Sequence, residues 1–133
     1  MATLVDTNVL LDILLEDEEW IEWSAAVVAA AAQQGRLLIN PIVYAELSSA
    51  YEDIEAMDRA LPADYYVREP LPWDAAFLAG RAFVAYRRRG GTRRSPLPDF
   101  YIGAHAAVAG HTLLTRDPQR YSSYFPKLRI VAP

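Results

Sequence analysis

The first twelve residues constrain the fold of this chain more than any other stretch. Leu4-Val5 runs directly into Asp6, and the apolar residues from Val9 to Leu14 then recur at helical spacing. This pattern predicts a buried strand that ends in a carboxylate and passes at once into a helix. Because ligand sites of open α/β sheets lie at the carboxyl ends of strands, Asp6 is the first candidate for a functional residue.

The same alternation of short apolar runs and helical segments continues along the chain. It predicts helices within residues 16–35, 40–50, 52–61, 72–85 and 97–109, and strands at 37–39, 65–67, 112–114 and 128–131. Asn40-Pro41 is typical of a helix start, whereas the segment from Tyr86 to Ser95 is expected to be a loop. We therefore expect one α/β domain over residues 1–133, with three layers around a mostly parallel sheet of four or five strands.

Composition excludes several classes of protein. Apolar residues make up 53% of the 133 residues and charged residues 23%, as in globular domains. The absence of cysteine excludes disulfides, thiolate metal sites and a cysteine nucleophile. The longest apolar run, residues 25–32, is shorter than the roughly 18 residues of a membrane span. Since the first strand also leaves no room for a secretory signal, we expect a soluble, cytoplasmic protein.

The charges are distributed unevenly along the sequence. The net charge is −4, but residues 1–66 have a balance of −11 and residues 67–133 a balance of +7. Twelve of the thirteen basic residues are arginine, whose guanidinium can contact phosphate with two parallel hydrogen bonds. This asymmetry is a weak indication of nucleic-acid binding.

Four carboxylates each have an ordinary structural explanation when taken singly. Asp6 can cap the helix that follows it, and Glu46 can be a solvated helix residue. Asp99 lies in the first turn of a helix, where the dipole favours negative charge, and Asp117 precedes Pro118 in a turn. None of the four positions by itself identifies a functional site.

Taken together, the four carboxylates indicate a metal site. A parallel sheet brings Asp6, Glu46, Asp99 and Asp117 to the same end of the fold, where their charges repel one another. A hard divalent cation relieves this repulsion, and Mg²⁺ prefers oxygen ligands. Such an ion can activate water and hold a phosphate for attack, so an acidic site with arginines nearby is consistent with a phosphodiesterase.

Four segments of the sequence carry a resemblance to a known family. They are Val5-Asp-Thr-Asn-Val-Leu-Leu-Asp12, Pro41-Ile-Val-Tyr-Ala-Glu-Leu47, Asp99-Phe-Tyr-Ile-Gly-Ala-His-Ala106 and Leu113-Leu-Thr-Arg-Asp117. In order and spacing they resemble the motifs of PIN-domain ribonucleases, and specifically the VapC-type toxins of toxin–antitoxin pairs. The resemblance spans nearly the whole chain and implies a single three-layer PIN-like domain.

The resemblance implies a function and a set of site residues. Asp6, Glu46, Asp99 and Asp117 would bind Mg²⁺ or Mn²⁺ and catalyse hydrolysis of RNA to 3′-hydroxyl and 5′-phosphate ends. Thr7, Asn8 and Thr115 would support the acids. The partners implied are a VapB-like antitoxin, whose tail covers the acidic site and often inserts a basic residue there, and a second copy of the chain in a homodimer. His105 and His111 match no catalytic position and are expected to be packing or surface residues.

The arginine run is open to two interpretations. Arg87, Arg88, Arg89, Arg93 and Arg94 can form a solvated helix end, where cations favour the dipole. They can also form a rim that binds the RNA backbone beside the acidic site.

Two alternatives to a ribonuclease remain open. A haloacid-dehalogenase-like phosphatase also begins with a strand that ends in aspartate, but it needs a second acid where this chain has Asn8. It also needs a lysine before the last acidic motif, and the only lysine here is Lys127. The other alternative is a PIN-like module that binds RNA or protein without cutting it.

Overall fold

The structure is a computed structural model that describes all of residues 1–133. None of its helices is both long enough and apolar enough to cross a membrane. The elements in chain order are β1 (Thr3–Val5), α1 (Thr7–Leu14), α2 (Ile21–Gln34), β2 (Leu37–Ile39), α3 (Pro41–Ser48), α4 (Ile54–Ala60), β3 (Tyr66–Arg68), α5 (Trp73–Arg88), α6 (Pro98–Ala109), β4 (Thr112–Leu114), α7 (Gln119–Ser122) and β5 (Ile130–Val131).

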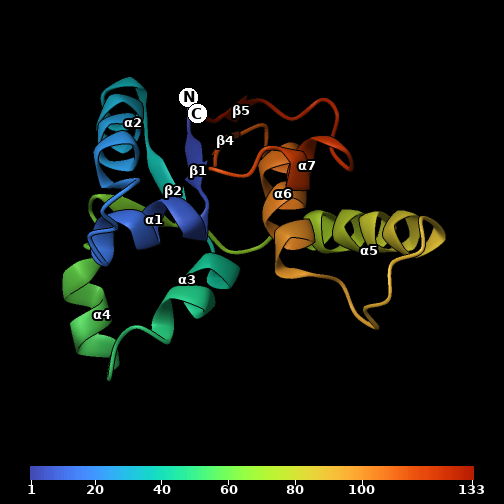
Figure 1. Cartoon of the computed structure of the whole chain (residues 1–133), viewed down its shortest axis with the longest axis horizontal. Helices are drawn as coiled ribbons and strands as arrows, with labels where there is room; N and C mark the ends of the chain where they lie inside the picture. The colour runs from blue at the N-terminus through green and yellow to red at the C-terminus, as the bar shows by residue number, and fades with distance from the viewer.

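The five strands form one parallel sheet in the order β3-β2-β1-β4-β5. The chain moves outward from β1 to β3 and then returns, continuing through β4 to β5 on the other side of β1. Because crossovers between parallel strands are right-handed, this reversal places α1–α4 on one face and α5–α7 on the other. Figure 1 shows these layers, with α1 and α2 on one side of the strands and α6 and α7 on the other. The predicted three-layer α/β fold is confirmed.

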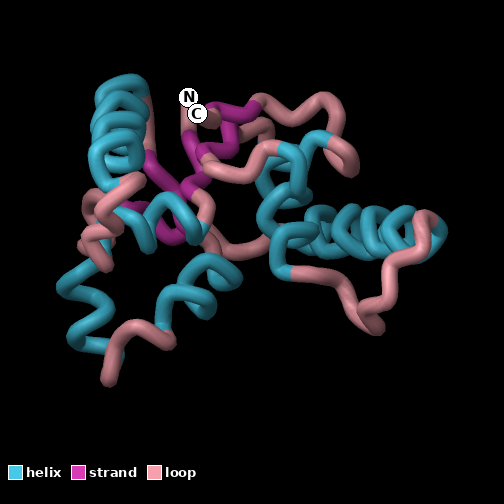
Figure 2. The backbone as a smooth tube through the Cα atoms, viewed as in Figure 1, coloured by secondary structure: helices cyan, strands magenta, loops and turns pink.

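The reversal also fixes where a ligand can bind. The strands β1 and β4 are neighbours, with Thr3 paired to Thr112 and Val5 to Leu114, and their following connections run in opposite directions. The carboxyl ends of such a pair form a topological switch point, where ligands of open α/β sheets bind. Figure 2 shows how short the strands are, so the helices begin close to this edge.

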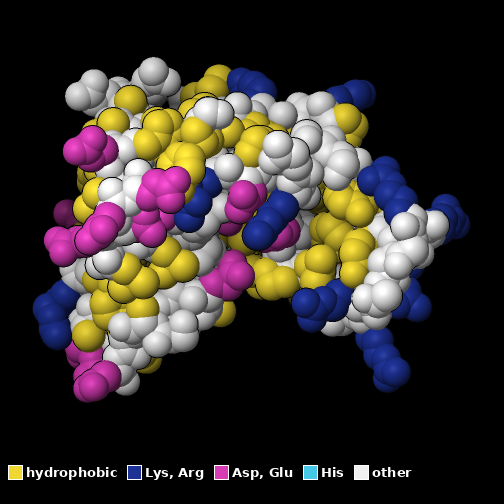
Figure 3. All heavy atoms as spheres, in the orientation of Figure 1, with side chains coloured by type: hydrophobic (Ala, Val, Ile, Leu, Met, Phe, Trp, Pro, Cys, Tyr) yellow, Lys and Arg dark blue, Asp and Glu magenta, His cyan; other side chains and the backbone are white.

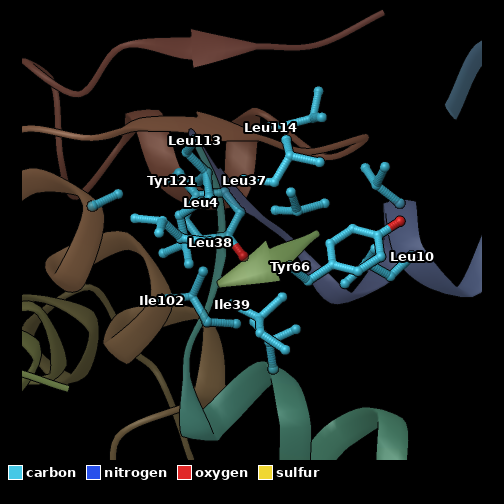
Figure 4. Packing of buried hydrophobic residues seen from close by; sticks show 14 of the residues in the cluster. Leu4, Leu10, Leu37, Leu38, Ile39, Tyr66, Ile102, Leu113, Leu114 and Tyr121 are labelled. Carbon is cyan, nitrogen blue, oxygen red and sulfur yellow. The ribbon is translucent and has the colours of Figure 1, made fainter. Parts of the chain in front are cut away.

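The core is built from the central strands and the helix faces that cover them. Leu4, Leu38 and Leu113 of the three central strands are fully buried. Figure 4 shows the strand leucines between Leu10 of α1 and Ile102 of α6. Because both faces of the sheet are covered, its central strands are apolar at most positions. Burial of each leucine contributes roughly 1.5–3 kcal/mol to stability.

Local signals in the sequence determine several helix ends as predicted. Asn40 is the N-cap of α3, where its Oδ1 accepts a hydrogen bond from the Val43 N–H at 2.9 Å, and Pro41 is the first helical residue. Gly110 ends α6 in the left-handed conformation, with φ 72°. The weakly alternating residues before Glu69 form β3, as expected.

Two expected boundaries are wrong. The acidic residues 16–19 precede α2, because the Asp17 carboxylate accepts the N–H groups of Glu19 and Trp20 and holds a turn there. The expected loop at Tyr86–Ser95 starts later, because α5 continues through Arg88. Arg87 and Arg88 thus lie in the last turn of this helix, where its dipole favours cations.

Helix α5 buries small residues and exposes two aromatic residues near its start. Ala75, Ala79 and Ala82 are the buried residues of this helix, and it packs against α6. Trp73 is 91% exposed and Phe77 is 67% exposed. The apolar face that these two residues share is therefore on the surface.

Gly103 of α6 lies against the rings of Phe125 and Tyr121. A Cβ added to Gly103 would lie 2.5 Å from Phe125 and 2.9 Å from Tyr121, and both rings are buried. We expect Gly103→Ala to destabilise the fold by about 1–2 kcal/mol, since overpacking costs about 1–3 kcal/mol and helix propensity returns at most about 1 kcal/mol. The measurement is urea unfolding followed by circular dichroism.

The matched control is Gly80→Ala in α5, where an added Cβ would meet nothing within 4 Å. It should stabilise the fold by about 0.5–1 kcal/mol through helix propensity alone. Equal shifts of both variants in the same direction would contradict the packing argument.

Candidate active site

Asp6 is at the carboxyl end of β1, and its side chain is only 5% exposed. Its Oδ1 accepts the Thr7 N–H at 2.7 Å, so this oxygen caps α1. Its Oδ2 accepts the hydroxyl groups of Thr115 at 2.7 Å and Tyr121 at 2.8 Å. The helix-cap interpretation and the site interpretation of Asp6 are therefore both correct, each for a different oxygen.

Burial raises the pKa of Asp6 to about 6 from its ordinary value of 3.8. The nearby Asp99 carboxylate adds to this rise, whereas the hydrogen bonds from Thr115, Tyr121 and Thr7 lower the pKa. Asp6 also has no ion-pair partner. A buried carboxylate in these surroundings is a strong candidate for a functional group.

Asp99 faces Asp6 across the hydroxyl of Tyr121. The Tyr121 oxygen is 2.8 Å from Asp6 Oδ2 and 3.3 Å from Asp99 Oδ1. One hydroxyl has a single proton to donate, so the shorter contact to Asp6 is the stronger bond. Burial raises the pKa of Tyr121, as do the two carboxylate charges, so the phenol stays protonated.

Asp117 joins the site through Asn8 and Thr115. The Asn8 amide donates to Asp117 Oδ2 at 3.1 Å and to Thr115 Oγ1 at 3.5 Å, and its oxygen accepts the Arg116 N–H at 3.3 Å. The Thr115 hydroxyl also accepts the Asp117 N–H at 3.1 Å. Asn8 and Thr115 thus hold the loop after β4 against the end of β1.

Glu46 reaches the same edge of the sheet from α3. The Thr7 hydroxyl donates to Glu46 Oε1 at 2.7 Å, which links α1 to α3. Glu46 itself is exposed, and Asp117 is 41% exposed in its side chain, so these two carboxylates form the open side of the site.

Arg120 and Tyr121 contact the acids, but nothing in the sequence reading singled them out. Arg120 lies 3.5 Å from Asp99 and 3.7 Å from Asp117. For Arg120 the signal available was its spacing, because a residue three positions after Asp117 on a helical turn faces back toward it. Tyr121 had no local signal, because its partners Asp6 and Asp99 are distant in the sequence. Arg120 and Tyr121 therefore complete the group of side chains at this edge.

The predicted arginine run does not contact the acids. Arg87 donates to the Arg93 carbonyl at 2.8 Å, and Arg89 lies 4.7 Å from the centre of the Tyr124 ring. In Figure 3 basic side chains gather at the far end of α5, separated from the acidic side chains by an apolar surface. The structure thus brings together the four carboxylates and their supporting residues but leaves this run outside the group.

Glu69, His105 and His111 form a separate cluster, in which three possible ligand atoms lie within 4.8 Å of one another. Glu69 Oε1 is 2.8 Å from His105 Nε2 and 2.7 Å from His111 Nε2. Asn40 uses its oxygen to cap α3, so its Nδ2 donates to His105 Nδ1 at 3.1 Å. The proton of neutral His105 therefore lies on Nε2, the atom that a metal would need.

This cluster is consequently a hydrogen-bonded part of the core and not a preformed metal centre. Burial lowers the pKa of His105, although the Glu69 carboxylate opposes that shift. The expectation that these histidines have packing roles agrees with these contacts.

The acidic group fits a hard divalent cation. Its potential ligands are carboxylate oxygens only, which suit Mg²⁺ or Mn²⁺ better than softer metals. Asp6 Oδ1 accepts a single hydrogen bond and keeps a lone pair free. The carboxylates are not packed as closely as ligands around an ion, because the Tyr121 hydroxyl and the Arg120 guanidinium stand between them.

Comparison with known proteins relates the chain to one family. The model of the PIN domain family matches residues 3–124. One similar solved structure is VapBC2 from Rickettsia felis bound to a fragment of promoter DNA. Its TM-score is 0.74 at 18% identity, and the match covers 99% of this chain and 98% of that chain. VapBC-1 from nontypeable Haemophilus influenzae gives a TM-score of 0.75 and 18% identity over 99% and 98% of the two chains.

A third solved structure agrees with these two. DNA-bound VapBC from Salmonella typhimurium gives a TM-score of 0.68 and 21% identity over 99% and 98% of the two chains. At such low identity the likeness shows a common fold. No curated protein sequence matches the chain at a significant level.

Removing the charge of Asp6 should stabilise the metal-free fold at high pH. A folded-state pKa of about 6, above the ordinary 3.8, means that the stability associated with protonated Asp6 is present below pH 3.8 and is lost as the pH rises through 6. We expect Asp6→Asn to raise the free energy of unfolding at pH 8 by up to about 3 kcal/mol. Denaturant unfolding in EDTA measures this change.

The pH dependence is the control for this prediction. The stability difference between Asp6→Asn and wild type should nearly vanish at pH 4, because the Asp6 carboxyl group of folded wild type is then neutral, like the amide of the variant. The variant is expected to fold, since the Tyr121 hydroxyl can donate to Asp99 Oδ1 and accept a hydrogen bond from the new amide. An equal difference at pH 4 and pH 8 would show that charge is not the cause.

Proposed function

The chain belongs to the PIN domain family, and from this premise we propose that it is a Mg²⁺- or Mn²⁺-dependent endoribonuclease. It acts as the cytoplasmic toxin of a VapBC-like toxin–antitoxin pair. The observation that carries this proposal is the convergence of four carboxylates, one of them buried, on the switch point of the sheet. The proposed metal-binding and catalytic set is Asp6, Glu46, Asp99 and Asp117.

The residues of the site have distinct roles in this mechanism. Asp6 and Asp99, which face each other, would hold the ion, and Asp117 and Glu46 would lie beside it on the open side. Thr115 and Asn8 orient Asp6 and Asp117, and Thr7 orients Glu46. When bound, a divalent ion activates water for attack on phosphorus and neutralises charge on the phosphate.

The shape of the site favours a polymeric substrate. Glu46 is exposed and the side chain of Asp117 is 41% exposed, so the acidic group opens onto the surface. An open acidic surface suits a nucleic-acid strand that passes across it, whereas small-molecule sites are enclosed.

Asn8 also acts as a hydrogen-bonding amide between Asp117 and Thr115, which is not the role of the general acid that a phosphatase needs there.

The arginine run is proposed to contact the RNA backbone away from the cleaved bond. Arg94 and the other four arginines of the run lie at the end of α5 and in the loop that leads to α6. The RNA strand would cross the apolar surface between them and the acids (Figure 3). Such contacts add affinity that does not depend on sequence.

Two protein partners are proposed, an antitoxin and a second copy of the chain. The similar solved structures described above are of VapBC, and Trp73 and Phe77 on α5 offer an exposed apolar face for association.

We expect a dimer by mass measurement of the purified protein in solution. A strict monomer at micromolar concentration would contradict the homodimer.

RNA cleavage tests the proposed activity. We expect purified protein to cut single-stranded RNA with Mg²⁺ or Mn²⁺ and not with EDTA. Asp99→Asn should lower the cleavage rate by at least about 100-fold, because it removes a ligand charge from the site, and Thr115→Val should lower it by about 10–100-fold. The matched control is Asp74→Asn in the first turn of α5, outside the acidic group.

Other outcomes would identify the alternatives. RNA binding without cleavage in any metal would indicate a non-catalytic PIN-like module. Hydrolysis of p-nitrophenyl phosphate but not RNA would indicate a phosphatase. Cleavage that persists undiminished in Asp6→Asn and Asp99→Asn would show that the site lies elsewhere.

A further inference from the structure

Arg120 is loosely held at the open side of the acidic site. Its Nη1 is 3.5 Å from Asp99 Oδ2 and its Nε is 3.7 Å from Asp117 Oδ2. Both distances exceed the 2.7–3.2 Å of a good N–H···O hydrogen bond. The side chain is also 61% exposed, so its guanidinium can leave the two carboxylates at little cost.

The base of this side chain is nevertheless fixed in place. Arg120 lies in the single-turn helix α7 next to Tyr121, which is fully buried and hydrogen-bonded to Asp6. The backbone at Arg120 is therefore tied to the centre of the acidic site, while its guanidinium remains free at the edge. An exposed and loosely paired cation on a fixed backbone is suited to binding an anion that arrives from solvent.

Arg116, which precedes Asp117 in the sequence, is already engaged elsewhere. Arg116 forms an ion pair with the buried Asp12 at 2.7 Å and lies over the Trp20 ring at 4.9 Å. Ser24 donates to the same Asp12 oxygen at 2.7 Å, which holds that carboxylate in the core. Among arginines, only Arg120 contacts members of the acidic set.

A phosphodiester that approaches four carboxylates is repelled unless a cation faces it. A metal ion held by the acids supplies part of that charge, and a guanidinium at their edge can supply the rest through two parallel N–H donors. We propose that Arg120 is the phosphate-binding residue of this site: it exchanges its contacts with Asp99 and Asp117 for the oxygens of the RNA phosphate at the acids. This inference rests on the proposed nuclease function.

A simpler role would be that of a counter-ion that only neutralises the acids. The two roles differ in what removal of the guanidinium changes. Loss of a phosphate contact weakens RNA binding and lowers its dependence on salt. Loss of a counter-ion strengthens the binding of Mn²⁺, because a competing cation has gone, and it leaves RNA binding nearly unchanged once a metal ion neutralises the acids in its place.

The experiment measures RNA binding with Ca²⁺ in place of Mg²⁺ or Mn²⁺, because a hard cation is then available to the acids as the proposal requires, and a gel run on each sample confirms that the RNA is uncut. Fluorescence anisotropy of a labelled single-stranded RNA gives Kd at several salt concentrations for wild type, Arg120→Ala, Arg120→Lys and Arg59→Ala. The control Arg59→Ala makes the same change in net charge on α4, away from the acids. Circular dichroism and thermal unfolding confirm that each variant is folded, and Mn²⁺ titration calorimetry gives metal affinity.

We expect Arg120→Ala to raise Kd about tenfold at low salt and to reduce the salt slope by about 0.7, the value for one phosphate contact on a single strand. Arg120→Lys should recover the slope but only part of the affinity, since an ammonium lacks the planar pair of donors. Arg59→Ala should change both quantities much less than Arg120→Ala does.

The inference is overturned if folded Arg120→Ala binds RNA with the wild-type Kd and slope, whether or not its Mn²⁺ affinity rises. Equal effects of Arg120→Ala and Arg59→Ala would overturn it too, because net charge alone would then explain the change. Failure of the nuclease proposal is a different result, namely no cleavage by wild type in any metal, and the binding comparison stays interpretable in that case.

Discussion

The parallel pairing of β1 with β4 is the contact on which the site depends. Its register places Val5 beside Leu114, so the chain leaves both strands at the same edge, at Asp6 and Thr115. The connections after these strands run to opposite faces and leave that edge open. The short bond between Thr115 and Asp6 then fixes the second half of the chain against the first.

The buried charge of Asp6 lowers the stability of the folded protein. Asp6 is buried beside Asp99 without an ion-pair partner, and hydroxyl groups only partly compensate for the loss of water. Arg120 provides a weak and exposed cationic contact at the edge. A fold selected for stability alone would not keep a carboxylate there, so the acidic group is best explained by a functional role such as the proposed metal site.

The hydrogen-bonded residues around the site also connect distant parts of the chain. Asn40 caps the helix that carries Glu46, and its amide holds His105 on the helix that begins with Asp99. Glu69 then joins His105 to His111 just before β4. This cluster has the composition of a metal site, but the tautomer that Asn40 imposes makes it a structural one. Ligand type alone is therefore insufficient to identify a metal centre, because the partners of each ligand decide which atom is free.

Much of the fold could be predicted because it rests on local signals. The strand before Asp6, the cap at Asn40 and the stop at Gly110 each follow from a few neighbouring residues, and their alternation predicts a parallel sheet. The four carboxylates could be selected because parallel strands end at one edge. The start of α2 and the length of α5 could not be predicted, since a carboxylate-held turn at Asp17 and the continued helix through Arg88 depend on competition between near-equal local structures.

The sequence by itself thus determined the order of elements apart from α7, the candidate acidic set and the family motifs, because these depend on spacing along the chain. The tertiary structure alone decided which charges meet. In the folded chain Arg120 and Tyr121 contact the acids, Arg116 forms an ion pair with Asp12, and the arginine run lies at the far end of α5. The physical reason is that a helix or strand fixes only the direction of each side chain, whereas the partner that it meets is set by how distant elements pack together.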